Sequence, residues 1–196
     1  MLKIIKNNKV FSFLLIISIV GVISSILICS LFDNSFKNMI TNRINNYINL
    51  INNSGISNIK TFKSLFIKNI TLVIFLWIIG ISIIGIPIVL FLYLTKVFVF
   101  SLEFVFLLIN MKMVNILFII TYLSFSLIYI VILFILLYYA FNYSLCLIKL
   151  IFFRREYNMF NITKRYLKLL VIILFLTFIY TLLEVFILPK LLNIFV

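Results

Sequence analysis

Two glutamates that stand alone in apolar sequence are the residues best placed to do chemistry in this chain. Glu103 and Glu184 are two of only four acidic residues among 196, and uncharged residues flank both. An ionisable side chain inside a bilayer is costly, so each glutamate is a functional candidate. For Glu103 there are two interpretations. The carboxyl group either forms a structural hydrogen bond to a neighbouring helix or belongs to an ion path. The alternative for Glu184 is a hydrogen bond that caps a helix break near Pro189.

The two glutamates are not expected to act as one pair. Glu103 follows Lys96 by seven residues, so these two charges share a helix face about two turns apart. From the ends of the apolar segments, we expect Glu103 nearer the inner membrane face and Glu184 nearer the outer face. The sequence therefore predicts no carboxylate dyad.

The remaining sequence lacks the side chains that catalysis requires. It has no His, a single Asp (Asp33), no Ser beside a plausible base and no glycine-rich phosphate loop. Cys29 and Cys146 lie in apolar sequence without a CxxC pair, which is typical of buried apolar residues. We predict no enzyme, no cofactor and no metal. Because two isolated glutamates do not converge at mid-depth, the sequence does not favour a transporter either.

Composition indicates an integral membrane protein. Apolar residues make up 66% of the chain, charged residues 11%, and the mean hydropathy is +1.34. The net charge of +13 would suggest nucleic acid in a soluble protein, but the basic residues lie in short segments between apolar runs. That placement is typical of topology signals, so the expected partner is membrane lipid rather than nucleic acid.

The apolar runs predict an all-α, polytopic helical bundle that forms a single membrane domain over residues 1–196. The first run is too long for a signal peptide and is expected to be retained. Lys96 divides a long apolar stretch into a second and a short third span; a break at Pro87 with a re-entrant hairpin is the alternative. The five expected spans are about 10–32, 69–92, 97–111, 115–140 and 169–188.

Small residues recur along one face of the first predicted span. Ser18, Gly21, Ser25 and Cys29 follow each other at helical spacing, which would let another helix approach closely. Small residues scattered without a role would account for the pattern equally well. The sequence alone leaves both interpretations open.

Two polar segments separate the spans. Residues 33–68 are expected to form an external loop with an amphipathic helix, and residues 149–168 a basic cytoplasmic loop. With the N-terminus inside and the C-terminus outside, ten of the 17 basic residues are cytoplasmic, which favours that orientation. The apolar face of the amphipathic helix, which could contact a partner, comprises Phe36, Ile40, Ile44, Tyr47, Ile48 and Ile51.

Two segments resemble the stage II sporulation protein M family. In "FLWIIGISIIGIPIVLFLYLTK" (75–96), Gly80, Gly85, Pro87 and Lys96 match that family's Gly-x-x-x-x-Gly-x-Pro span and the basic residue that opens the next span. "LLEVFILPKLL" (182–192) resembles its final span, with Glu184 and Pro189 in place. The glycines would allow close helix contact and Pro87 a kink, so these residues are candidates for packing rather than catalysis.

The resemblance implies a non-enzymatic membrane protein of the engulfment machinery in endospore-forming bacteria. It implies peptidoglycan-degrading, membrane-anchored partners that are held at the sporulation septum in the cell membrane. The alternative is a permease-like or transporter-accessory protein. Some positions depart from the family: Val97, Ser101 and Val105 replace frequent glycines, Glu103 is unusual there, and a proline near the fourth span has no counterpart.

Overall fold

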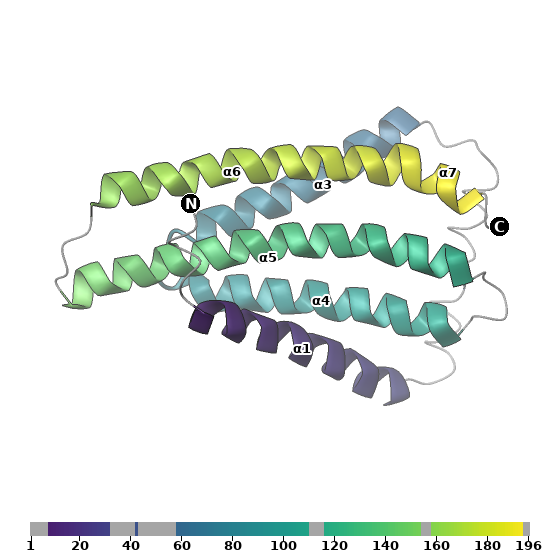
Figure 1. Cartoon of the computed structure of the whole chain (residues 1–196), viewed down its shortest axis with the longest axis horizontal. Coiled ribbons are helices and arrows are strands. Elements are labelled where there is room, and N and C mark those ends of the chain that lie inside the picture. The colour runs from purple at the N-terminus through teal and green to yellow at the C-terminus, as the bar shows by residue number, and fades with distance from the viewer. Residues whose placement is uncertain (1–7, 32–41, 43–57, 110–115, 154–157, 194–196) are drawn as a thin grey trace.

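The protein is a bundle of long apolar helices. The computed structural model describes residues 8–31, 42, 58–109, 116–153 and 158–193, and these are helical except around short turns (Figure 1). The elements are α1 (Asn8–Leu31), α3 (Asn58–Ile79), α4 (Gly85–Ile109), α5 (Ile116–Phe153), α6 (Met159–Leu182), a π-helical turn η1 (Leu183–Ile187) and α7 (Leu188–Asn193).

Five helices in the described part of the chain are long and apolar enough to cross a membrane. The candidate spans are Lys9–Cys29, Thr61–Ile79, Gly85–Leu108, Ile116–Phe152 and Met159–Leu191. The predicted all-α bundle of five spans is therefore confirmed. Many large apolar side chains face outward, as a lipid solvent permits, with Leu27 of α1 61% exposed and Phe91 of α4 63% exposed.

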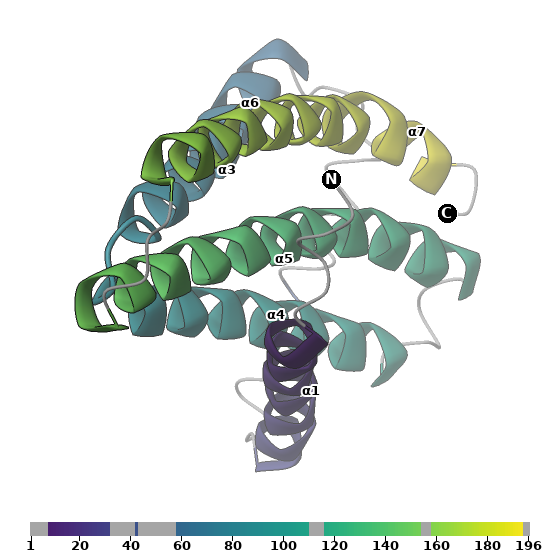
Figure 2. The ribbon, with the colours of Figure 1, turned by 60° about the vertical axis from the view of Figure 1, so that its left-hand side comes forward.

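The helices are arranged in layers. α3 and α6 lie across one side of α5, α4 packs along α5, and α1 packs mainly on α4 (Figures 1 and 2). The core between the layers takes fully buried residues from separate helices: Leu14 from α1, Val73 from α3, Leu136 from α5 and Ile173 from α6. The chain passes back and forth, so α1, α4 and α6 run one way and α3 and α5 the other.

The small residues of α1 form its interface with α4. A Cβ atom at Gly21 would lie 3.1 Å from Cγ1 of Val97, and the buried hydroxyls of Ser25 and Ser101 are 2.6 Å apart. Cys29, at the end of the stripe, is also buried and is a free thiol. Close packing and short interhelical hydrogen bonds hold membrane helices together, so the stripe has a structural role.

The predicted boundary at Lys96 is wrong. α4 continues without interruption through that residue, and the chain instead reverses between Gly80 and Ile84. A charge in lipid is costly, which is why Lys96 suggests a span end in the sequence, but in the structure its side chain lines a polar cavity within the bundle. The predicted second span, 69–92, accordingly belongs to two helices, and the third span is not short.

The polar segments are also shorter than predicted. α5 continues to Phe153 and α6 begins at Met159, so most of the expected cytoplasmic loop 149–168 is helical. The side chain of Asn158 accepts a hydrogen bond from the backbone N–H of Asn161, at 3.3 Å, and caps the start of α6. Similarly, α3 already begins at Asn58, within the expected external loop 33–68.

The final helix does not stop before Pro189. It passes through η1, where the wider turn accommodates a proline that cannot donate to a carbonyl in the preceding turn, and continues as α7. The sequence predicted that the last span closes at Leu188. In the structure Pro189 instead widens one turn of a span that continues past it.

Candidate functional site

A polar cavity of about 190 Å³ lies between α3, α4, α5 and the end of α6. Its polar side chains come from every one of these helices. They are Lys68 and Asn69 of α3, Lys96 and Glu103 of α4, Tyr122, Ser126 and Tyr129 of α5, Tyr180 of α6 and Glu184 of η1. Apolar side chains, among them Leu65, Val99 and Phe100, complete the lining.

Glu103 is held from α5. The hydroxyl of Tyr122 donates a hydrogen bond of 3.2 Å to Oε2 of Glu103. The carboxyl group also interacts electrostatically with Lys96, on its own helix, and with Lys68 across the cavity. The structure therefore gives Glu103 a hydrogen bond to a neighbouring helix and two lysines whose positive charges attract its carboxylate form.

Glu184 enters the same cavity from the π-helical turn. Its carboxyl group interacts with the side chains of Tyr180 and Asn69 and with the charges of Lys68 and Glu103. Yet Oε2 of Glu184 is buried and has no hydrogen-bond partner in the described part of the chain. π-helical turns are frequent at functional sites, where the extra residue re-aims side chains.

The expectation that the two glutamates lie at opposite membrane faces is wrong. Glu103 is five residues from the end of its span at Leu108, and Glu184 is seven residues from the end of its span at Leu191. At 1.5 Å per residue, both lie about 8 to 10 Å from the same end of the bundle. The error follows from the misplaced boundary at Lys96, which put Glu103 near the start of a span.

Aromatic rings form one wall of the cavity. The rings of Tyr129 and Tyr180 stack with centroids 5.1 Å apart and an interplanar angle of 21°. The hydroxyl of Tyr129 is buried without a hydrogen-bond partner among the described residues. The sequence did not single out these tyrosines, because a tyrosine in an apolar run resembles an interfacial anchor. Their one signal in the sequence is a polar hydroxyl group far from the span ends.

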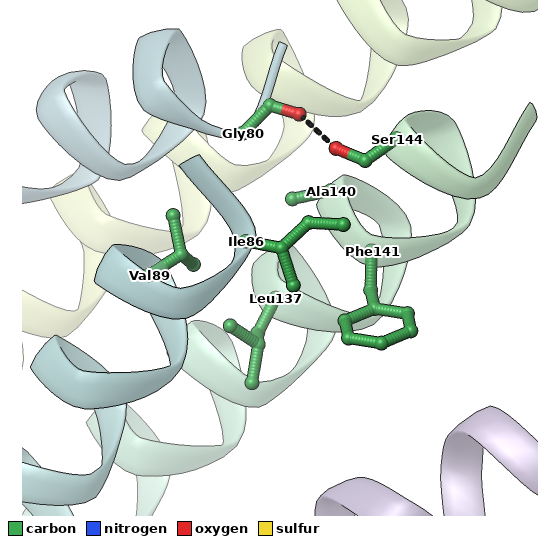
Figure 3. A pocket seen from close by; sticks show the side chains of 7 residues that line it. All are labelled: Gly80, Ile86, Val89, Leu137, Ala140, Phe141 and Ser144. Atoms are coloured by element: carbon green, nitrogen blue, oxygen red, sulfur yellow. Dashed lines mark hydrogen bonds between the residues drawn. The ribbon is translucent and has the colours of Figure 1, made fainter. Parts of the chain in front are cut away.

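Gly80 and its surroundings make a second cluster of motif residues, at the turn between α3 and α4. Figure 3 shows Gly80 facing Ala140 and Ser144 of α5. The void that remains between these residues and their neighbours is only about 10 Å³. The Ser144 hydroxyl donates to the carbonyl of Gly80 at 2.8 Å. A Cβ atom at Gly80 would lie 2.7 Å from Cβ of Ala140 and 2.8 Å from the hydroxyl of Tyr166, so only glycine fits.

Gly85 and Pro87 start α4 immediately after this turn. A Cβ atom at Gly85 would collide with the backbone of Ile79, and the Gly85 N–H donates to the Ser82 hydroxyl at 2.8 Å. Pro87 lies in the first turn of α4, where its missing N–H is not needed. The expected kink at Pro87 is therefore wrong: the proline helps to begin a helix after a reversal.

No group of three or more potential metal ligands from His, Cys, Asp and Glu occurs among the described residues. Cys146 lies apart from the glutamates, beside a separate cavity lined by Tyr143 and Arg165. The amphipathic segment from Phe36 to Ile51 lies outside the described residues.

The fold defines a class: a polytopic membrane protein whose described residues form five helices able to span a membrane, with a charged cavity between them. The family model for stage II sporulation protein M matches residues 4–189, nearly the whole chain. The chain belongs to this family, which confirms the resemblance, and it is a multi-pass sporulation membrane protein. The family is not a known enzyme family. Comparison with curated proteins and with solved structures gave no match.

Proposed function

We propose that the protein is a non-enzymatic membrane scaffold of the sporulation engulfment complex. The observation that carries the proposal is the family match over residues 4–189. In this role the bundle anchors or localises membrane-anchored peptidoglycan hydrolases at the septum. Gly80, Gly85 and Pro87 then serve to hold α3 and α4 together as a rigid platform.

The outer surface of α1 supports this role. α1 contacts the bundle along one narrow stripe, and its opposite side is apolar and exposed, with Ile16 58% and Ile23 52% exposed. Such a surface can pack against a partner's transmembrane segment as well as against lipid. The segment from Phe36 to Ile51, which follows α1 in the sequence, is the second surface that we propose for partner contact.

Co-purification from sporulating cells tests the scaffold. A tagged chain should retain peptidoglycan-degrading proteins after detergent extraction, whereas an equally abundant, unrelated multi-pass protein with the same tag should not. A deletion strain should stop before engulfment is complete. If no wall-degrading partner co-purifies and the deletion strain still completes engulfment, the scaffold proposal is wrong.

A permease-like or transporter-accessory function is the second candidate, and the polar cavity favours it. Polar groups from four helices converge there, as ion or substrate paths in membranes require. Glu103→Gln should then abolish complementation of the deletion strain, while the exposed Lys63→Gln should complement fully. Full complementation by Glu103→Gln would exclude an ion-coupled role for this carboxylate.

A further inference from the structure

The charged cavity needs a polar occupant. Lys68, Lys96, Glu103 and Glu184 all line it, and no direct ion pair joins them in the part of the chain that the structure describes. Charges held in a bilayer are stable only when they are paired, hydrogen-bonded or solvated. The cavity of about 190 Å³ has room for roughly six water molecules or for one small polar group, but not for a helix.

The lining has two chemical characters. Lys68, Lys96 and Asn69 supply positive charge and hydrogen-bond donors, which suit a phosphate group. Glu103 and Glu184 supply negative charge, and the stacked tyrosines stand beside them. Carboxylates together with aromatic faces suit an ammonium group. Two positive and two negative charges balance, so a simple anion or a simple cation would leave one pair unmatched.

Two atoms in the cavity wall lack the partners that their burial requires. They are Oε2 of Glu184, an acceptor, and the hydroxyl of Tyr129, both without a hydrogen bond among the described residues. Buried polar atoms in folded proteins are nearly always satisfied. Both belong to the acidic and aromatic wall, where a donor such as an ammonium group could satisfy them.

The cavity is bounded by helices that separate toward its end of the bundle. α3 and α4 meet at the turn 80–84 and diverge from there (Figures 1 and 2). The lining between them includes Val99, which is 49% exposed, and Lys68, which is also exposed. Leu65 and Phe100 add apolar surface to the same lining. A lipid could therefore enter from the side, with its headgroup inside and its chains along α3 and α4.

We propose that the cavity binds a phosphate–ammonium zwitterion, the headgroup chemistry of phosphatidylethanolamine. The phosphate lies at Lys68 and Lys96, and the ammonium group lies at Glu103 and Glu184 beside the tyrosines. This role does not depend on the scaffold function. A purified protein that binds no hydrolase would still bind the zwitterion.

Native mass spectrometry of the full chain released from nanodiscs tests the site. Two kinds of nanodisc are used, in which phosphatidylglycerol is mixed with an equal amount of either phosphatidylethanolamine or phosphatidylcholine. The protein should retain one phosphatidylethanolamine molecule, in preference to phosphatidylglycerol or phosphatidylcholine. Glu103→Gln and Glu184→Gln should each lower that retention about tenfold, the equivalent of one lost charge-assisted hydrogen bond. Lys63→Gln, an exposed position on α3, should leave it unchanged.

A soluble competitor separates the two sources of this chemistry. Free phosphoethanolamine should displace the retained lipid from the wild-type protein. If it binds in a Glu103-dependent manner while no lipid is retained, the zwitterion site stands and its ligand is soluble. Equal retention of phosphatidylglycerol and phosphatidylethanolamine by the wild-type protein, with no binding of phosphoethanolamine, would overturn the proposal whether or not any variant folds.

Discussion

At the residue scale, the absence of a side chain at position 80 decides whether α3 and α4 can reverse against α5. The positions that a Cβ atom would meet belong to Ala140 and Tyr166, on two different helices. Ala140 is the single alanine of the chain, and its Cβ cannot move without its backbone. Glycine and alanine together therefore set the distance between the turn and the bundle.

We expect Gly80→Ala to lower the free energy of unfolding by about 1 to 3 kcal/mol, the usual cost of overpacking. The measurement is an SDS titration followed by fluorescence of Trp77. This residue is the only tryptophan, and its ring stacks on Tyr166 at 5.3 Å. Gly21→Ala should cost less, since Val97 can withdraw the tip of its side chain. Equal stability of Gly80→Ala and the wild type would contradict the packing role.

Ser144 gives a second residue-scale prediction. Its fully buried hydroxyl reaches the carbonyls of Gly80 at 2.8 Å and Ser82 at 3.2 Å. Ser144→Ala should cost about 1 to 3 kcal/mol, because it leaves a buried carbonyl group without a donor. The matched control is Ser124→Ala on the same helix. The exposed hydroxyl of Ser124 donates to the carbonyl of Ile120, within α5 itself. If both variants lose the same stability, the turn does not depend on this hydrogen bond.

At the element scale, the interface of α1 and α4 shows how departures from the family pattern are accommodated. Where the family tends to have glycines, α4 carries Val97 and Ser101. The structure places Gly21 of α1 against Val97 and Ser25 of α1 against Ser101. The small side chains that close approach requires are thus supplied by the partner helix.

Disulfide cross-linking tests this register. In a chain whose two native cysteines are replaced by alanine, Ser25→Cys with Ser101→Cys should form a disulfide on mild oxidation, because their hydroxyls are 2.6 Å apart. The product has altered mobility on a denaturing gel. Ser24→Cys with Ser101→Cys should remain reduced, since one residue along α1 turns the side chain by about 100°. Cross-linking of the control pair alone would show that the register is wrong.

The sequence predicted the number of spans but not where they turn, and the reason is physical. Hydropathy detects long apolar runs, and all five helices contain one. The reversal at 80–84 contains a single polar residue, Ser82, so hydropathy passes over it. Lys96 looked like a boundary only because a charge was assumed to seek water outside the bundle. Gly80 and Gly85 carried the correct signal, and a turn at these residues places Glu103 and Glu184 at the same end of the bundle.

For a related reason, the sequence could not predict that Lys68, Lys96, Glu103 and Glu184 line one cavity. Lys68 is the last residue of the expected external loop 33–68, whereas in the structure it belongs to α3 and lines the cavity. Which face of each helix points inward depends on the crossing of α3 over the bundle. No periodicity in the sequence specifies that crossing, because these helices are apolar nearly all round.

At the scale of the whole molecule, the described part of the chain has five candidate spans, an odd number, so we expect the start of α1 and the end of α7 on opposite sides of the membrane. The start of α1, the end of α5 and the start of α6 lie at one end of the bundle, and α7 lies at the other (Figure 1). Once Lys68 and Lys96 are assigned to the cavity, nine basic residues flank the first end and six flank the second. The excess of three basic residues at the first end is the same as in the count that includes the cavity lysines, and it still favours an inside N-terminus.

Thiol labelling of intact cells tests this orientation, again without the native cysteines. Lys190→Cys, exposed on α7, should react with a membrane-impermeant maleimide from outside, whereas Asn161→Cys, exposed near the start of α6, should react only after permeabilisation. The reverse pattern would invert the orientation and leave the bundle intact. Labelling of both positions from one side would contradict the fifth span itself, because α6, η1 and α7 would then not cross the bilayer. With an inside N-terminus, the cavity lies in the outer half of the membrane, since Glu103 and Glu184 are within about 10 Å of the α7 end.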